Sequence, residues 1–390
     1  MQRESQRLIV TIFGMAAVAM SLLQPILPLY LTSIDIPPEF IGLMISVSMI
    51  AMAIGEGYWG WVADKVGVRI PLYVGTFVCG ITVLFFVLAE SVMVLFVVFF
   101  FWGLFRSAIF GPSRGVLAAG SPLGKKATRL AIVTAILAAA NSLGALPSGF
   151  IADAWGYSSV FFFSAGISLG GALIVLFGIK GIKPVKEELK SAEGFFVNNK
   201  LWPLTLQCSV TVFQYLGLGI LIAFLPLLVT QVMKASAAEV GILISARGIA
   251  SMLFSVPMGA LADRLGNQKM MFFGLFITAV SMIGFSLANS FAWFVVIIIF
   301  HSIGYSSFSP AALSMFSSTA PLNRQGTTMG FYGAICENSG LIAGSALGGF
   351  VWSAWGGEVT FLLGAAASFI GAIVFYFFLS FQRKNSNLSK

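Results

Sequence analysis

Charged residues are scarce in this 390-residue chain. Asp, Glu, Lys and Arg make up 9% of it, against roughly 25% in soluble globular domains. Hydrophobic residues make up 58%, so the chain cannot cover a water-facing surface with polar side chains. The composition therefore excludes a soluble enzyme and makes the lipid bilayer the solvent in which the chain must fold.

Residues of metal and redox chemistry are scarce too, with one His and three Cys. Cys79, Cys208 and Cys336 fall inside apolar runs without metal-ligand spacing, and we expect them to be small buried residues. The chain has no Gly-rich phosphate-binding loop ending in Lys-Ser/Thr and no nucleophile with an adjacent base. We therefore expect no enzymatic activity, cofactor or metal.

Long apolar runs fill most of the chain. A helix that crosses about 30 Å of hydrocarbon needs about 20 residues. Twelve runs of suitable length occur, at 8–31, 39–63, 70–89, 92–118, 129–152, 157–179, 203–231, 238–261, 270–288, 292–317, 327–351 and 359–381. The sequence therefore predicts an all-α, multi-pass membrane protein.

The net charge of +8 is distributed by membrane side. Of the 22 Lys and Arg residues, Arg106, Arg114 and Arg247 lie within spans and Lys234 lies on the opposite side, while the rest fall in alternate loops and the two tails. This positive-inside pattern predicts that both termini are cytoplasmic. We expect the protein to lie in the inner (cell) membrane. No basic stripe suited to nucleic acid is present, and we expect a monomer in the lipid bilayer.

An internal repeat relates the two halves of the chain. Four segments recur at an offset of 198 to 200 residues: Leu27-Pro28-Leu29 with Leu225-Pro226-Leu227, 42–46 with 241–245, 60–64 with 259–263, and 149–156 with 349–356. Such a repeat predicts two six-helix bundles of equal orientation and pseudo-symmetric arrangement. The expected boundaries are 1–182 and 201–390 for the bundles, with a cytoplasmic linker at 183–200.

Polar residues avoid every third span. Spans 3, 6, 9 and 12 carry no ionisable side chain at mid-depth beyond a tyrosine, whereas the others carry Gln24, Glu56, Arg106, Asn141, Gln214, Arg247, His301 and Glu337. Because a charge inside the bilayer must face protein or water, we expect every third helix to be peripheral and the others to surround an interior.

A loop motif after span 2 connects these features to a known family. Gly60, Asp64, Lys65, Gly67 and Arg69 form it, with Val68 in place of one basic residue, and a second copy keeps Gly259, Asp263, Arg264 and Gly266. On this helix pattern the chain resembles the major facilitator superfamily over essentially its whole length. The resemblance implies two bundles that rock about a central site lined by spans 1, 4, 7 and 10, with Asp64 helping to hold the cytoplasmic side closed.

Two further features favour the drug and metabolite exporters of that family, which exchange substrate for protons. Span 5 has Gly144, Pro147 and Gly149, a displaced form of their glycine-proline motif, and Arg106 resembles their membrane-buried arginine. We therefore expect proton-coupled export of small organic molecules by rocker-switch alternating access. Proton-coupled uptake or facilitated diffusion of a polar metabolite is the alternative, and a lipid flippase or membrane sensor is an alternative of another class.

Four residues are candidates for proton coupling: Glu337, Glu56, Arg106 and His301. Arg106 and Glu337 lie near mid-depth by count, where each can instead form a static salt bridge, Glu337 with Arg247 for example. Glu56 lies at a depth similar to that of Arg114, which favours a gating salt bridge between them. His301 has an unperturbed pKa near 6.5, which suits a relay, although a neutral, hydrogen-bonded histidine is the commoner case.

Polar and aromatic residues near the midplane are candidates for contact with substrate. Each can equally bridge two helices. The set comprises Gln24, Trp102, Arg106, Asn141, Gln214, Arg247 and Tyr305.

Overall fold

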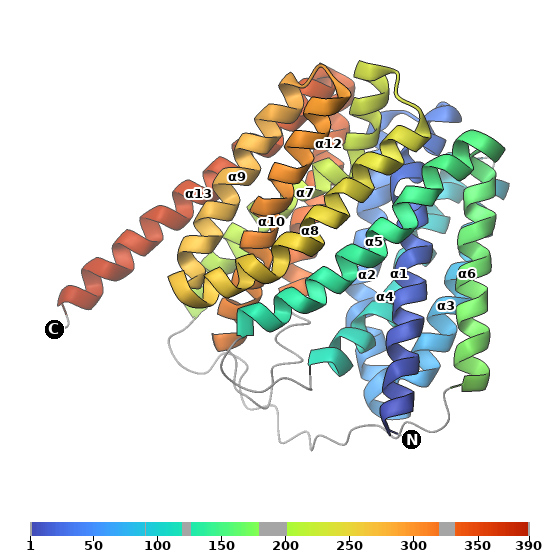
Figure 1. Ribbon diagram of the computed structural model, residues 1–390, viewed down its shortest axis with the longest axis horizontal. Coiled ribbons are helices and arrows are strands. Elements are labelled where there is room, and N and C mark those ends of the chain that lie inside the picture. The colour runs from blue at the N-terminus through green and yellow to red at the C-terminus, as the bar shows by residue number, and fades with distance from the viewer. Residues whose placement is uncertain (1, 90, 119–125, 179–200, 320–331, 389–390) are drawn as a thin grey trace.

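The computed structural model describes residues 2–89, 91–118, 126–178, 201–319 and 332–388, and every element in these ranges is a helix (Figure 1). The first half contains α1 (Gln2–Ser33), α2 (Pro38–Val66), α3 (Arg69–Leu88), α4 (Val92–Ala118), α5 (Lys126–Trp155) and α6 (Tyr157–Gly178). The second contains α7 (Leu201–Met233), α8 (Ala237–Leu265), α9 (Asn267–Leu287), α10 (Phe291–Thr319), the π-helical turn η2 (Tyr332–Glu337), α12 (Asn338–Trp355) and α13 (Gly357–Leu388). The helices agree with the predicted spans.

Four glycines end helices at equivalent places in the two halves. Gly67, Gly156, Gly266 and Gly356 have φ between 82° and 97°, a conformation that costs little only without a Cβ. The N–H of Gly67 donates to the carbonyl of Ala63 at 2.9 Å, and the other three make the equivalent bond to the residue four positions before them. The glycines of the repeated motifs thus turn the chain sharply from one span into the next.

The helices form two bundles that meet along α1, α2 and α5 on one side and α7, α8, α10 and α12 on the other. Helices α3, α6, α9 and α13 make their main contacts within their own bundle, which confirms the prediction that every third helix is peripheral. Ten described helices are long and apolar enough to cross a membrane. The other two, α5 and α12, are rich in small residues and lie where the bundles meet. The linker expected at 183–200 lies outside the described residues, so its boundaries stay a prediction.

Both termini lie on the lower side of Figure 1. We call the opposite end of the bundles the far face. It carries the connections after α1, α3, α5, α7, α9 and α12, because each of these helices runs away from the termini's side.

The repeated Leu-Pro-Leu segments shape α1 and α7. A proline inside a helix leaves the backbone without one hydrogen bond. Thr32 Oγ1 donates to the carbonyl of Pro28 at 3.0 Å, and Thr230 Oγ1 donates to that of Pro226 at the same distance. The repeat therefore preserves a local hydrogen bond one turn beyond each proline.

Candidate functional site

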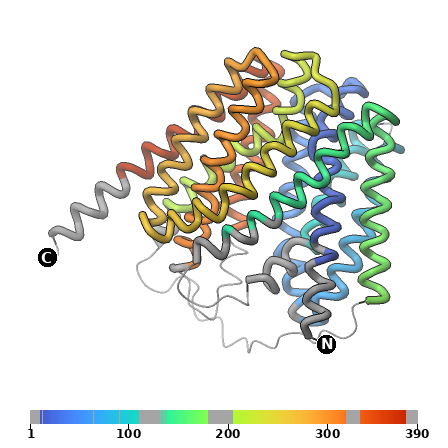
Figure 2. Tube along the Cα trace, viewed as in Figure 1, coloured from blue at the N-terminus to red at the C-terminus, as the bar shows by residue number. Residues whose placement is uncertain are grey.

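Two equivalent interfaces join the bundles, one between α5 and α8 and the other between α2 and α12. Figure 2 shows α5 and α8 side by side along much of their length. Ser142 and Ser245 each donate a side-chain hydrogen bond to the other's backbone carbonyl at 3.2 Å. At the second interface, the hydroxyls of Ser46 and Ser345 lie 2.8 Å apart. Small hydroxyl residues therefore bond across both interfaces.

Glycines bring the helix backbones together at the same two interfaces. A Cβ on Gly42 of α2 would overlap the carbonyl oxygen of Ser345 and lie 3.2 Å from the Cα of Gly349. A Cβ on the equivalent Gly241 of α8 would lie 2.8 Å from the carbonyl oxygen of Ala145. Backbone atoms cannot move aside as side chains can, so only glycine permits this approach. The repeated segments 42–46 and 241–245 are thus interface residues.

Arg106 of α4 lies half-buried among soft, polarisable groups. Its Nη2 donates to Met52 Sδ at 3.0 Å and to Met49 Sδ at 3.4 Å, and its Cζ lies 4.7 Å from the centroid of the Trp102 ring. A guanidinium over an indole face gains cation–π attraction, and its planar fork carries several N–H donors for polar partners. The structure thus brings together two predicted residues, Arg106 and Trp102.

Glu337 ends the π-helical turn η2 and is the acceptor of a short hydrogen bond. Tyr215 of α7 donates its hydroxyl to Glu337 Oε1 at 2.5 Å, and the Tyr215 ring centroid lies 6.4 Å from that of Tyr305 on α10. Short π-helical turns recur at functional sites, and an O–H donor to a carboxylate is a strong partner. The two predicted residues Glu337 and Tyr305 are therefore linked through Tyr215, a mid-span tyrosine that the sequence analysis missed.

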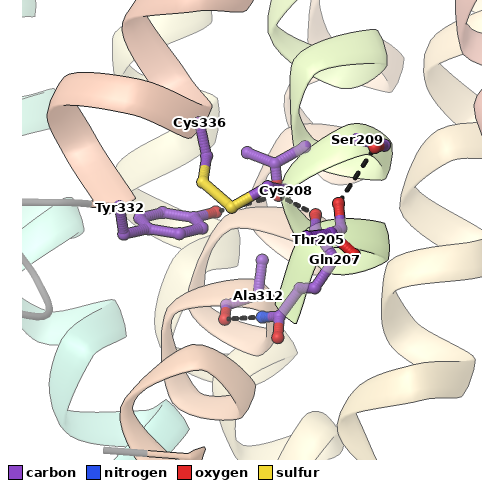
Figure 3. Close-up of a disulfide and its surroundings, with 8 residues drawn as sticks. Thr205, Gln207, Cys208, Ser209, Ala312, Tyr332 and Cys336 are labelled. Carbon is purple, nitrogen blue, oxygen red and sulfur yellow. Dashed lines mark hydrogen bonds between the residues drawn. A yellow bond between two sulfur atoms is a disulfide. The ribbon is translucent and has the colours of Figure 1, made fainter. Parts of the chain in front are cut away.

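A disulfide joins α7 to η2 at the residue before Glu337, with Tyr332 beside it (Figure 3). Cys208 of α7 and Cys336 of η2 are bonded, with their Cα atoms 4.9 Å apart. The hydroxyl oxygens of Thr211 and Tyr332 lie 3.4 Å apart. The expectation of unpaired cysteines is wrong for these two, because 128 residues separate them and spacing alone cannot reveal that their spans are neighbours. Cys79 is free and buried, as expected.

His301 of α10 is fully buried, and neither ring nitrogen has a hydrogen-bond partner among the described residues. The alternative of a neutral, hydrogen-bonded histidine therefore finds no hydrogen-bond partner among the described residues. Arg247 of α8 is near enough to interact electrostatically with both His301 and Tyr305. Arg247, His301 and Tyr305 therefore form a polar group inside the second bundle.

The remaining cavity candidates differ in their surroundings. Gln214 is buried and donates to Thr278 Oγ1 on peripheral α9 at 2.9 Å, which fits the alternative of a bond between helices. Asn141 is exposed on α5, beside the interface residue Ser142. Gln24 on α1 and Glu56 on α2 are half-buried.

The loop motif at the termini's side is described in part. Lys65 Nζ lies 3.9 Å from the Trp61 ring centroid, and Arg69 Nη2 donates to the carbonyl of Leu176 on α6 at 2.7 Å. The side chains of Asp64 and Arg114 lie outside those that the structure describes, so their gating roles stay predictions. In the first copy, nothing lies within 4 Å of an ideal Cβ on Gly60. In the second copy, Gly259 is buried, and Asp263 and Arg264 are exposed. Across the described ranges, no three His, Cys, Asp or Glu residues gather as a metal site.

Two pseudo-symmetric six-helix bundles, closed against each other and carrying polar groups inside each, define a multi-pass membrane transporter and not an enzyme. The profile of the Major Facilitator Superfamily matches residues 9–209 and 207–389. The chain belongs to this superfamily, and the twelve-helix, two-bundle prediction is confirmed.

Curated relatives that match along nearly the full chain are named for multidrug resistance or efflux. Multidrug resistance protein MdtG of Klebsiella pneumoniae (strain 342) is 25% identical over 99% of this chain and 96% of its own. The multi-drug resistance efflux pump PmrA homolog of Lactococcus lactis subsp. lactis (strain IL1403) is 24% identical over 94% of this chain and 93% of its own. The resemblance to the drug-exporting branch of the superfamily is thereby confirmed.

Solved structures share the fold at low sequence identity. The nucleoside transporter NupG has a TM-score of 0.74 at 14% identity, covering 95% of this chain and 98% of its own. A bacterial homolog of the human lysosomal transporter Spinster, in an inward-facing and occupied conformation, has a TM-score of 0.75 at 14% identity and 95% coverage of both chains. These likenesses concern the fold alone.

Proposed function

We propose that this protein exports small organic molecules in exchange for protons, by alternating access between its two bundles. One observation carries the proposal: a carboxylate, Glu337, lies within a membrane-spanning bundle and accepts a hydrogen bond from Tyr215. A carboxylate in a membrane span has a high free-energy cost, so such residues are rare and usually mark a substrate or proton pathway. The similarity to proteins named for multidrug resistance and efflux supports the substrate class and the direction.

Glu337 is the proposed proton carrier. As a carboxylate it accepts the hydroxyl hydrogen bond of Tyr215, and as an acid it has its own O–H to donate. Protonation also removes a negative charge beside Tyr215, whose ring neighbours that of Tyr305. A ligand or proton shifts a conformational equilibrium only by binding the two states differently, and this rearranged pairing supplies such a difference.

Arg106 is the proposed counterpart in the first bundle. Thioethers and an indole contact its guanidinium, and the planar fork of donors suits an anionic or polar substrate. The midplane groups carry a slight excess of positive charge, which favours neutral or anionic substrates over lipophilic cations. Gln24, Trp102, Asn141, Arg247 and Tyr305 are the further proposed substrate contacts.

The proposed setting is a cell membrane, with a monomeric chain whose termini are cytoplasmic and whose far face is external. The distribution of Lys and Arg supports this orientation. The proton gradient is the proposed energy source and no cofactor is needed.

Transport into inside-out vesicles tests the proposal. Vesicles with an acidified interior should concentrate a fluorescent drug when they contain the wild-type chain, because such vesicles present the cytoplasmic side outward. Glu337→Gln should abolish this acid-driven accumulation while drug binding to purified protein persists. The matched control, Glu358→Gln, changes an exposed carboxylate in the first turn of α13 and should transport normally. Unchanged pH-driven transport in Glu337→Gln would refute the coupling role, and substrate release from acidified vesicles would favour uptake instead.

A further inference from the structure

The far face carries a contact between the bundles that involves a carboxylate and a helix N-terminus. Asp153, in the last turn of α5, accepts the backbone N–H of Ala237 on Oδ1 at 3.0 Å and that of Ala238 on Oδ2 at 2.9 Å. Both donors are the first residues of α8, which belongs to the other bundle. One side chain therefore receives two hydrogen bonds across the α5–α8 interface.

These two donors are ones that α8 cannot satisfy itself. A helix leaves its first four N–H groups without partners in the helix. Ser236 and Glu239 satisfy each other in a capping box, with Ser236 Oγ accepting from the Glu239 N–H at 3.3 Å and Glu239 Oε2 accepting from the Ser236 N–H at 2.8 Å. The N–H groups of Ala237 and Ala238 instead bond to Asp153. A negative charge at a helix N-terminus is also attracted by the helix dipole.

At the equivalent place in the α2–α12 interface, the carboxylate is on the helix that begins there, and the helix that ends there supplies the donor. Ser353 of α12, the repeat equivalent of Asp153, donates its hydroxyl to the carboxylate of Glu39 in the first turn of α2. Pro38 stands at the position of Ala237, and proline has no N–H to donate. A carboxylate at position 353 would therefore lack the first of the two donors and would face the Glu39 carboxylate, whereas a serine hydroxyl can donate to it.

Glycines beside both contacts hold the helices at this distance. A Cβ on Gly149 would lie 2.7 Å from the Cα of Ala238, and a Cβ on Gly349 would lie 2.7 Å from the carbonyl oxygen of Pro38. The backbones at the far face are thus in direct contact at both interfaces. A chain that opens there must break both contacts together.

We propose that Asp153 is a gating residue: by capping α8 from the opposite bundle, it holds the far face closed, with the Ser353–Glu39 bond as its counterpart. This inference rests on the proposed alternating access, since only a transporter that opens its far face needs to release the cap. Asp153 is exposed, so water can replace it on α8 and the cap is releasable. Its removal favours the open state without unfolding either bundle.

Distance measurement between two spin labels by double electron–electron resonance tests the role of Asp153 as the cap of α8. Labels on Cys introduced at Ile34 of the first bundle and Asn289 of the second, in a chain without its native cysteines, report opening of the far face. Asp153→Ala should raise the open-to-closed ratio about fivefold, the low end of couplings between sites, because the carboxylate is exposed. Asp153→Asn keeps one acceptor oxygen and should give a smaller rise. The control Glu358→Ala should leave the ratio unchanged.

Two more variants keep the test decisive. Ser353→Ala should also raise the ratio, and Ser353→Asp should raise it further, because two carboxylates would then face each other at the α2–α12 interface. Melting temperatures within a degree or two of the parent would show that the bundles stay folded. An unchanged distance distribution in Asp153→Ala and Ser353→Ala would overturn the proposal, as would a loss of thermal stability without any change in the distribution.

The distance measurement needs no substrate and no proton gradient. If the vesicle assay shows no proton-driven export, the distances still report whether Asp153 closes the far face. If Asp153→Ala leaves the distances unchanged while the wild type transports drug, only the gating role fails.

Discussion

Gly42 offers the sharpest test of the closed interface between α2 and α12. Replacing it with alanine places a Cβ against the carbonyl oxygen of Ser345 and 3.2 Å from the Cα of Gly349, both in the opposite bundle. Neither atom belongs to a flexible side chain, so the clash is relieved only if the two helices move apart. Gly42→Ala should therefore shift the protein toward the state that is open at the far face.

The magnitude follows from the cost of overpacking. Extra methyl groups forced into close contacts cost about 1–3 kcal/mol, and 1–3 kcal/mol corresponds to about a 5–150-fold change in an equilibrium ratio. Because the contact is with backbone, we expect the upper half of that range. Alanine also favours the helix by about 1 kcal/mol relative to glycine, but α2 is helical in both states, so this gain does not affect the ratio between them.

Two other glycines serve as matched controls. A Cβ on Gly103 of α4 would lie 2.7 Å from the carbonyl carbon of Ser48, a residue of the same bundle, so Gly103→Ala should lower the melting temperature and leave the far-face distances unchanged. Gly57 has nothing within 4 Å of its ideal Cβ, so Gly57→Ala should leave the far-face distances unchanged and raise the melting temperature slightly, because alanine favours the helix. Spin-label distances and thermal unfolding in detergent measure both. If Gly42→Ala behaves like Gly103→Ala, with lost stability and unaltered distances, the interface does not control access.

Other parts of the structure give smaller tests. Tyr215→Phe removes the donor to Glu337, a bond to a charged group worth about 1.5–3 kcal/mol, and should displace the pH profile of vesicle transport; an identical profile would contradict a role in coupling. Gly67→Ala places a Cβ at a φ of 87°, which costs about 1–2 kcal/mol, and should lower the melting temperature measured by calorimetry. In unreduced, denatured protein, a maleimide should modify one of three cysteines in the wild type and two in Cys208→Ser, counted by mass spectrometry; three in the wild type would disprove the pairing with Cys336.

The repeated segments predicted more of the structure than their length suggests. Segments 42–46 and 241–245 carry the glycines and serines through which the bundles touch, and 149–156 and 349–356 carry the far-face contacts. These segments resemble each other because both interfaces need backbone-to-backbone approach, which permits few residue types. Hydrophobic runs and glycine positions therefore sufficed to predict the helices, their order and the pairing of the two halves.

Contacts between side chains on different helices could not be predicted from the sequence. Tyr215 and Glu337 are 122 residues apart, and Cys208 and Cys336 are 128 apart, so neither pair follows from spacing along one helix. Gln214 illustrates the same limit: its place near the midplane was predictable, but its orientation toward Thr278 on α9 depends on the rotation of α7 within the bundle. Depth can be counted along the chain, whereas the face of a helix that meets a neighbour depends on packing.

The two halves keep similar residues at the interfaces where the bundles meet, and differ where polar groups lie inside the bundles. At an offset of 199 residues, Arg106 corresponds to Tyr305, and Arg247 corresponds to Ser48. The first bundle thus presents a cation in contact with thioethers and an indole, whereas the second presents a tyrosine–carboxylate pair and also carries Arg247 and His301. Rocking of two bundles needs matched interfaces, because each must open and close as a unit. Binding and proton exchange need different groups on the two sides of one site, so divergence is expected there. On this reasoning, exchanging Arg106 and Tyr305 between the bundles should abolish transport even though the far-face interfaces, which contain neither residue, still close.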